Sequence, residues 1–539
     1  MIYLCGNRTT CDKFNFDGVI VCMSYISENP GILPYYVYGT ETDTPFQTGM
    51  HTPRVFRVPD GFSFNNGTAA PATTERTEIR LPLTAESNQL LYLDLGHLEK
   101  DDAYDTVLLL DGAFISASVF LNGYAAAVIK DTLMGEMVII DGYLRSSNRM
   151  YILFGQASSG RDNILRSVRV VKLKKSRITD ISVKSRLTGS SAEIVCDTTV
   201  ISGDIKASLG GSIEVLLLDR AGTELLLAKR AVAAFTRNYW QAIRLGFVLD
   251  NARLWSCDDP YRYTVRVRFL LYDGSVSDMK EIPYGIRELS MRRYSKRNAA
   301  SPALLLNDIP LRIRGIVAGE HDGRLPGKLK AAGINAVRVL NPYNRAFFEA
   351  CDNEGILVMC EAYADVNAER RSLFGSRRKN TDPLDTSLAL LGEMIIRLKN
   401  YASVFCWSVG IRKPFGNTVI GEFIHSLDNT RTINCQGDSS FALSDFFSAD
   451  DCELQQLELV ESHSFVFEGN ILGIHYSPRV YRNYPFLLCD VDVDQENIGQ
   501  KIGIFNRCRR FLGLFLSSSD GNPVKAAAEL LKESAPDDK

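Results

Sequence analysis

The chain has 539 residues, of which 45% are hydrophobic and 23% are charged, a composition typical of globular proteins. At ~150 residues per domain, this length is too great for one hydrophobic core and predicts about three domains. The formal net charge of −3 gives no electrostatic reason to expect a nucleic-acid or anionic-membrane partner. No window approaches the ~20 apolar residues that a membrane span needs.

The N-terminal segment, residues 1–34, gives no indication of its role. It lacks a basic stretch followed by an apolar core, so a secretory signal is not evident. The twelve cysteines form no CxxC pair, and Cys196, Cys406 and Cys489 lie in apolar, strand-like runs. This pattern favours reduced, buried thiols in a cytoplasmic protein over a disulfide framework or a zinc site. With six histidines and no HExxH motif, we expect no metal and no cofactor.

From about residue 75 to residue 290, apolar and polar residues alternate with period two, and turn residues interrupt the pattern every ten residues or so. The first set of expected strands runs from "TEIRLPL" to "MYILFGQ", and the second runs from "ITDISVKSRL" to "YRYTVRVRFLLYDG". Short strands with frequent turns are typical of β-sandwiches. We therefore expect one sandwich over residues 35–175 and another over residues 176–290.

Beyond residue 290, helical stretches alternate with short apolar strands. "LPGKLKAAG" precedes "INAVRVL", and "DTSLALLGEMIIRLKNY" precedes "SVFCWSVG". In the longer helix Leu388, Leu391, Ile395 and Leu398 fall on one face. This alternation over residues 291–539 fits a (β/α)₈ TIM barrel in size. The expected fold class is therefore multidomain, with two β-sandwiches followed by an α/β barrel.

The residues at the C-terminal ends of the expected barrel strands are the first candidates for a site, because active sites of such barrels lie there. They are carboxylates, cations, aromatic rings and one amide, a set suited to binding sugar hydroxyls and the C–H face of a sugar ring. Any one of them, Glu361 for example, could equally serve in a salt bridge at the barrel rim. The candidates are Arg338, Asn341, Tyr343, Glu361, Arg412, Asp438, His475, Tyr476, Asp490 and Asp520.

An ordered series of motifs makes the chain resemble glycoside hydrolase family 2, the β-galactosidases, β-glucuronidases and β-mannosidases. The resemblance covers about residues 75 to 520. It implies a jelly-roll sugar-binding domain, an immunoglobulin-like sandwich and a catalytic TIM barrel, in that order. The motifs include "ASVFLNG" (117–123), "NARLWSCDDPYRYTVRV" (251–267), "YGIREL" (284–289) and "LKAAGINAVRVLNPYNRAFFEACDNEGILVMCEA" (329–362).

The catalytic motifs depart from the family pattern. The family sequence "N-H-P-S-V-x-x-W-S-x-G-N-E" ends in the glutamate that acts as acid and base, and here "NYASVFCWSVGIR" ends in Arg412. Trp407 keeps its expected place. Asp490 stands at the position of the nucleophilic glutamate, and Asn341 replaces the histidine of "S-H-Y-P".

These replacements bear directly on hydrolysis. Retaining glycosidases need two carboxyl groups about 5–5.5 Å apart. Arginine keeps its proton at any relevant pH and can act neither as acid nor as base, and the loss of an acid/base group costs about 10²–10⁴ in rate. The shorter side chain of Asp490 misplaces the nucleophile by about 1 Å, which can cost roughly another 10². We also expect Arg412 to pair with Asp490.

Three hypotheses follow. The leading one is a non-catalytic homologue that binds a carbohydrate or a protein partner. The second is an active β-glycosidase with displaced carboxylates, Glu361, Asp438 and Asp490, for instance as an inverting pair about 6.5–9.5 Å apart. The third is a scaffold or assembly subunit, such as a homo-oligomer, whose pocket is filled by side chains. In the first two, the expected binding residues are Arg338, Asn341, Glu361, Trp407, Asp438, His475 and Tyr476.

Overall fold

A computed structural model describes most of the chain between residues 83 and 518. Before residue 83 it describes five short strands, and after residue 518 it describes residue 524 alone. The described ranges are 15–16, 19–20, 32–33, 54–57, 77–78, 83–86, 89–113, 115–132, 135–156, 162–201, 210–233, 240–292, 303–319, 321–340, 342, 344–362, 383–409, 417–435, 444–449, 470–471, 474–475, 486–493, 497–508, 511–518 and 524.

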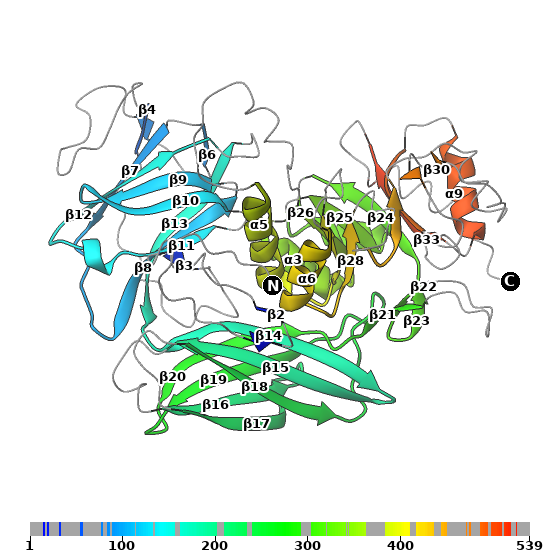
Figure 1. The fold of residues 1–539 in the computed structure, drawn as a ribbon, viewed down its shortest axis with the longest axis horizontal. Helices are drawn as coiled ribbons and strands as arrows, with labels where there is room; N and C mark the ends of the chain where they lie inside the picture. Colours follow the sequence, from blue (N-terminus) through cyan, green and yellow to red (C-terminus); the bar gives the residue numbers. More distant parts are fainter. Residues whose placement is uncertain are drawn as a thin grey trace.

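The first domain is a β-sandwich made of a six-stranded sheet and a five-stranded sheet (Figure 1). The strand orders are β10-β9-β12-β7-β4-β5 and β3-β11-β8-β13-β6. The strands are β3 (Ile32–Leu33), β4 (Arg54–Arg57), β5 (Thr77–Glu78), β6 (Leu83–Ala85), β7 (Gln89–Gly96), β8 (Tyr104–Ala113), β9 (Ile115–Leu121), β10 (Tyr124–Thr132), β11 (Glu136–Ile139), β12 (Asn148–Phe154) and β13 (Asn163–Lys174). Because β3 pairs with β11, a strand from the N-terminal segment whose role the sequence left open belongs to this sandwich.

The hairpin between β9 and β10 explains part of the "ASVFLNG" motif. Asn122 and Gly123 both have positive φ, 52° and 84°, as the two central residues of a type I′ turn require. The Asn122 side chain donates to Asn148 Oδ1 at 3.0 Å and accepts from the Arg149 backbone N–H at 2.9 Å. The motif therefore fixes the turn and ties it to β12.

The second domain is a smaller sandwich of a three-stranded and a four-stranded sheet. Their strand orders are β14-β15-β18 and β17-β16-β19-β20. Ile194, Val215 and Phe269 have no exposed surface and lie in the core between the two sheets. The strands are β14 (Arg177–Thr188), β15 (Ser191–Ile201), β16 (Gly211–Leu218), β17 (Glu224–Val232), β18 (Trp240–Leu249), β19 (Tyr263–Leu271) and β20 (Val276–Tyr284).

The third domain contains an eight-stranded parallel sheet in the order β28-β27-β26-β25-β24-β33-β32-β29. The first strand, β24, pairs with both β25 and the last strand, β33, as a barrel requires. The strands are β24 (Ile313–Ala318), β25 (Ala336–Leu340), β26 (Leu357–Ala362), β27 (Val404–Val409), β28 (Thr432–Cys435), β29 (Phe447–Ala449), β32 (Phe486–Asp492) and β33 (Phe511–Ser517). The described helices are α2 (Leu325–Ala331), α3 (Arg345–Glu354), α5 (Pro383–Leu398), α6 (Asn417–Leu427) and α9 (Ile498–Arg507).

The two edge strands of this sheet are joined through the residues just before β29. The Asp445 backbone N–H donates to the Ile433 carbonyl at 2.9 Å, and the Ile433 N–H donates to Asp445 Oδ2 at 2.8 Å. The sheet therefore comes round on itself as a TIM barrel, and the fold class expected from the sequence is confirmed.

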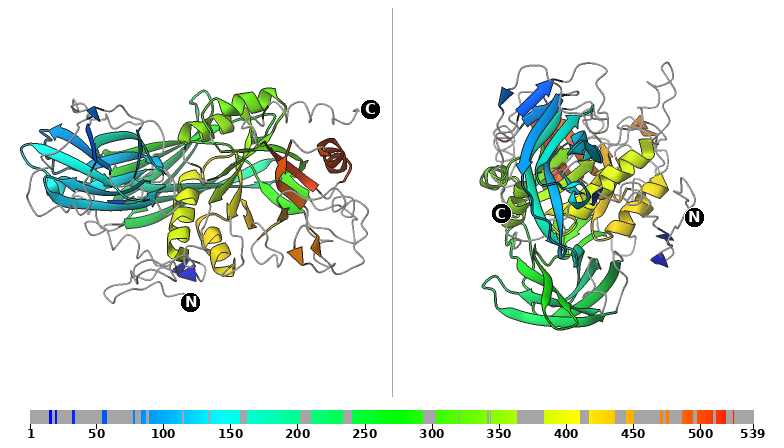
Figure 2. Two further views of the ribbon diagram at one scale, coloured as in Figure 1. Left: turned by 90° about the horizontal axis from the view of Figure 1, so that it is seen from above. Right: turned by 90° about the vertical axis from the view of Figure 1, so that its left-hand side faces the viewer.

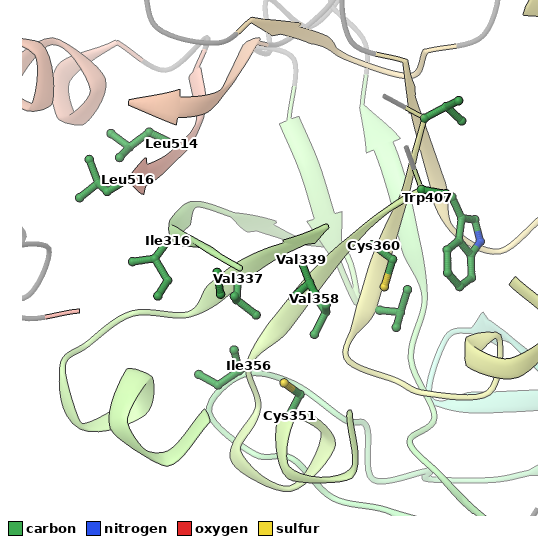
Figure 3. Close-up of a cluster of buried hydrophobic side chains, with 14 of the residues drawn as sticks. Ile316, Val337, Val339, Cys351, Ile356, Val358, Cys360, Trp407, Leu514 and Leu516 are labelled. Carbon is green, nitrogen blue, oxygen red and sulfur yellow. The ribbon is translucent and has the colours of Figure 1, made fainter. Parts of the chain in front are cut away.

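Alternate side chains of the barrel strands enter two different cores. One lies between the strands and the helices, where Figure 3 shows Val337, Val339, Val358 and Cys360 grouped with Cys351 of α3. Leu388, Leu391, Ile395 and Leu398 of α5 belong to the same core, as the helical pattern predicted. The other core fills the lower interior of the barrel, meaning the part toward the N-terminal ends of its strands. It contains Met359, Phe405, Phe446 and Phe515.

Polar contacts attach both sandwiches to the barrel, which lies beside them in the views of Figures 1 and 2. From the second sandwich, the Val183 backbone N–H donates to Asn400 Oδ1 at 2.9 Å, and Asn400 Nδ2 donates to the Ile181 carbonyl at 2.8 Å. From the first, Thr132 Oγ1 donates to Glu393 Oε1 of α5 at 2.9 Å. Among the described residues, no helix is long and apolar enough to cross a membrane.

The contact between β11 and α5 gives a pH prediction. Burial, with a smaller contribution from the nearby Glu393 carboxylate, raises the pKa of Glu136 from 4.5 to about 8. The folded protein therefore holds a proton that the unfolded chain releases. The stabilisation is fully present below pH 4.5 and is lost as the pH rises to about 8, with a slope of up to about 1.4 kcal/mol per pH unit. Denaturant titrations at several pH values measure it. In Glu136→Gln this slope should be absent, and an unchanged slope would refute the assignment.

Candidate functional site

Four neighbouring barrel strands each place one polar side chain inside the barrel. Glu361 of β26 pairs in register with Ser408 of β27, and Ser408 pairs with Asn434 of β28. Arg338 lies on β25, opposite Met359, and its long side chain reaches Glu361. All four side chains are buried, and Ser408 and Asn434 have no exposed surface. They form one polar cluster above the apolar lower interior.

Arg338 and Glu361 form a forked ion pair. Arg338 Nη2 donates to both carboxylate oxygens at 2.9 Å, and Nε donates to Oε2 at 3.2 Å. The two side chains are only 5% and 4% exposed. Two parallel N–H donors match the planar carboxylate, which is the strongest common geometry for such a pair.

Ser408 and Asn434 extend the cluster. Ser408 Oγ donates to Glu361 Oε2 at 2.7 Å, and Asn434 Nδ2 donates to Ser408 Oγ at 3.2 Å. Asn434 Oδ1 is buried and accepts no hydrogen bond from any described residue. Because both oxygens of Glu361 are occupied by donors, this carboxyl could act as a proton donor or nucleophile only if the Arg338 fork opened.

Trp407, five residues before Arg412, lies on the other side of β27. It has no exposed surface and belongs to the core between strands and helices, which Figure 3 shows. Its Nε1 donates to Asp428 Oδ2 at 2.8 Å. This placement favours a packing role, in which the indole holds β27 against the loop after α6.

The Asp428 carboxylate that receives this hydrogen bond is also paired with Arg431 at 3.0 Å. Burial acts to raise the pKa of Asp428, but the Arg431 charge and hydrogen bonds from Thr430 and Trp407 outweigh it and lower the pKa. The anchor of Trp407 is therefore an ionised carboxylate at neutral pH.

The structure locates the remaining predicted residues only in part. Asp490 lies on β32, the seventh barrel strand, and His475 lies on β31 (Ile474–His475), but their side chains are outside the described set. Arg412 follows β27, the fourth strand, by three residues. The other predicted site residues also lie outside the described residues and stay predictions: Asn341, Tyr343, Arg412, Asp438, Tyr476 and Asp520.

Two residues of the cluster, Ser408 and Asn434, were not among the candidates from the sequence. Each is flanked by apolar residues in a short buried strand, so nothing local marks it. His321, also not predicted, follows β24 outside this cluster and packs edge-on against Phe347, with ring centroids 5.0 Å apart. Burial lowers the pKa of His321 to about 4, so its ring is neutral at pH 7.

Within the described part of the chain, no group of three or more His, Cys, Asp or Glu side chains could hold a metal ion.

Comparisons with known proteins agree with this architecture. Residues 176–287 match the family model "Glycosyl hydrolases family 2", and residues 321–494 match "Glycosyl hydrolases family 2, TIM barrel domain". A β-galactosidase of Oenococcus oeni is 23% identical over 453 residues, which are 76% of this chain and 41% of the relative. The chain thus spans about two fifths of the length of this curated relative.

Solved structures share the fold at low sequence identity. A glycosyl hydrolase family 2 member from Bacteroides cellulosilyticus superposes with a TM-score of 0.67 and 17% identity, covering 88% of this chain and 65% of that one. A β-glucuronidase from Ruminococcus gnavus, solved with an N1-substituted uronic isofagomine, gives 0.69 and 16%, covering 93% and 99%. At these identities the likeness concerns the fold alone.

The buried fork gives a stability prediction. Arg338→Met leaves the Glu361 carboxylate buried without its cation, and we expect the free energy of unfolding to fall by about 3–5 kcal/mol. In the double variant Arg338→Met/Glu361→Met most of this loss should be recovered, because no buried charge remains.

Denaturant unfolding of the two variants and the wild type measures the difference. Arg253→Met, which removes an exposed partner of Asp259 in the second sandwich, is the matched control and should change stability little. A double variant as unstable as Arg338→Met would contradict the explanation.

Proposed function

We propose that this chain, which belongs to glycoside hydrolase family 2, is a non-catalytic member that binds a carbohydrate at the C-terminal edge of its barrel. The observation that carries the proposal is Arg412. It occupies the place of the acid/base glutamate in "WSVGIR", and an arginine cannot exchange a proton at neutral pH.

The position of β27 supports this alignment of the motif. The strand runs from Val404 to Val409 and carries Trp407 and Ser408 on opposite faces. Arg412 therefore follows a barrel strand whose register is fixed on both sides, by Glu361 on β26 and by Asn434 on β28. A shift that brought a carboxylate to the same place would have to break both contacts.

The buried fork argues against one version of the alternative, an active enzyme with displaced carboxylates. Glu361 was a candidate for such a role, and its two oxygens are held by Arg338 and Ser408. Asp438 and Asp490 remain as the carboxylates from which a displaced pair would have to be built.

The binding half of the proposal depends on polar groups and on the relatives. Asn434 Oδ1 is a buried acceptor without a partner among the described residues, and sugar hydroxyls supply donors for such atoms. The matched relatives are a β-galactosidase and a β-glucuronidase. We therefore propose a β-galactoside or a β-glucuronide as the ligand, in a protein that works alone, as a homo-oligomer or with a protein partner.

We also propose a cytoplasmic location. The seven cysteines whose side chains are described are buried and form no disulfide, and burial raises the pKa of Cys196 to about 12 and that of Cys257 to about 11. Buried thiols outside disulfides suit a reducing compartment.

The catalytic prediction is a loss of hydrolysis. Aryl β-galactosides and aryl β-glucuronides should be cleaved at least ~10⁴-fold more slowly than by an active family member, from the product of a missing acid/base and a misplaced nucleophile. The double variant Arg412→Glu/Asp490→Glu should raise the rate, whereas either single change should not. Turnover by the wild type that Asp490→Asn abolishes would overturn the proposal.

The binding prediction is a ligand-induced rise in the thermal midpoint. A galactoside or glucuronide that binds the folded barrel stabilises it by mass action, and Arg412→Ala or Asn341→Ala should change the rise. Arg253→Ala in the second sandwich, which removes an exposed partner of Asp259, serves as the control and should leave it unchanged. If no sugar of a monosaccharide and oligosaccharide panel shifts the midpoint, the binding half of the proposal fails.

A further inference from the structure

A polar cavity of ≈ 150 Å³ lies between the second sandwich and the barrel. Ser185 and Tyr284 line it from the sandwich, Arg287 and Glu288 from the connection that follows β20, and Asn429 and Arg431 from the loop before β28. Since β27 begins at Val404 and β28 at Thr432, this is the N-terminal end of the barrel strands. The cavity is therefore at the opposite end from the proposed carbohydrate site and is independent of it.

Arg287 brings a charge to this cavity without a matching carboxylate. Its side chain is buried, with 7% of the residue exposed. Its Nε donates to the Ala402 carbonyl at 2.5 Å, and its Nη2 donates to the Val404 carbonyl. Its Nη1 makes no hydrogen bond to any described residue, and this atom is not fully buried. Since Arg287 lines the cavity, Nη1 is the guanidinium atom left to face it.

The charge of Arg287 is costly in this position. Burial, together with repulsion from Arg431, lowers the pKa of Arg287 to about 9. A buried cation without an anionic partner carries a large desolvation penalty. Arg431 differs, because its Nη1 is paired with Asp428 at 3.0 Å and its Nη2 donates to the Tyr401 carbonyl at 2.8 Å. One of the two guanidinium groups at the cavity is therefore neutralised and the other is not.

Asn429, an exposed residue that also lines the cavity, brings a second free donor to it. Asn429 Oδ1 accepts from Lys184 Nζ at 3.0 Å, and its Nδ2 has no partner among the described residues. Burial also lowers the pKa of Lys184, so a negative charge nearby would relieve both cations. The two hydroxyl groups at the cavity already donate their protons within the protein. Tyr284 OH donates to Ser185 Oγ at 3.0 Å, and Ser185 Oγ donates to the Arg287 carbonyl at 2.9 Å.

We propose that this cavity binds a small oxoanion of the size of inorganic phosphate or sulfate, held by Arg287 Nη1 and Asn429 Nδ2. The anion neutralises the unpaired guanidinium and connects residues of the second sandwich to the loop before β28. Glu288, whose Oε2 accepts from the Leu187 N–H at 2.7 Å, is the negative group at the cavity and limits the affinity. Bound anion therefore stabilises the junction between the two domains.

The test is the thermal midpoint and calorimetric binding of the full chain with inorganic phosphate, at constant pH and ionic strength. We expect a saturable rise in the midpoint with phosphate and with sulfate, and none with the same concentration of chloride. In Arg287→Met the affinity should fall at least tenfold. Arg253→Met removes an exposed arginine of the same sandwich, paired with Asp259, and should bind as the wild type does. No rise in the wild type, or an equal rise with chloride, would overturn the proposal.

A second pair of variants covers the case in which Arg287→Met fails to fold. Glu288→Gln keeps an acceptor for the Leu187 N–H and removes the opposing charge, so phosphate should bind several-fold more tightly. Asn429→Ala should weaken binding several-fold. An affinity that neither change alters would show that phosphate binds elsewhere and would refute the assignment of this cavity.

Discussion

The interior of the barrel depends on the fork between Arg338 and Glu361. A carboxylate that is 4% exposed cannot be left without a cation, and the fork provides two parallel donors across adjacent strands. Glu361 in turn sets the place of Ser408, and Ser408 that of Asn434. A polar row thus runs across four strands directly above an apolar core. The ion pair and these hydrogen bonds together keep the strands in one register at the edge where the barrel opens.

The opposite end of the barrel is organised around backbone carbonyls. Arg287 donates to the Ala402 and Val404 carbonyls, and Arg431 donates to those of Tyr401 and Val404. These carbonyls belong to residues that precede or begin β27. The pairing of β27 with β28 starts only at Cys406, so side chains satisfy the carbonyls instead. Arg287, in the connection that follows the second sandwich, and Arg431, in the barrel, therefore hydrogen-bond the same short segment before β27. The cost is a concentration of positive charge on the two arginines, of which Arg431 is ion-paired with Asp428.

The sequence predicts the fold well because both kinds of layer leave periodic patterns. Alternation with period two identified the sandwiches, and Leu388, Leu391, Ile395 and Leu398 identified the buried face of α5. The site is harder to predict because β26 and β27 are buried on both faces. No alternation then distinguishes the inward Ser408 from the outward Trp407. The register shift between Val358 and Met359 opposite β27 determines which residues of β27 point into the barrel. The shift exists only in the paired strands, so neither sequence segment reveals it alone. The polar cavity is likewise formed by residues as distant as Ser185 and Asn429.

Binding and proton transfer are separable in a site of this kind. An enzyme accelerates hydrolysis only through groups that act more strongly in the transition state than in the bound state, and the acid/base carboxyl is such a group. The register of β27, its anchor through Trp407 and Asp428, and the polar row beneath it do not depend on that carboxyl. In the proposed non-catalytic site, Arg412 in place of the glutamate would remove a reaction step without removing the support of the strand end. In the proposed site, the fixed positive charge of Arg412 would favour an anionic ligand, such as a uronate, over a neutral hexose.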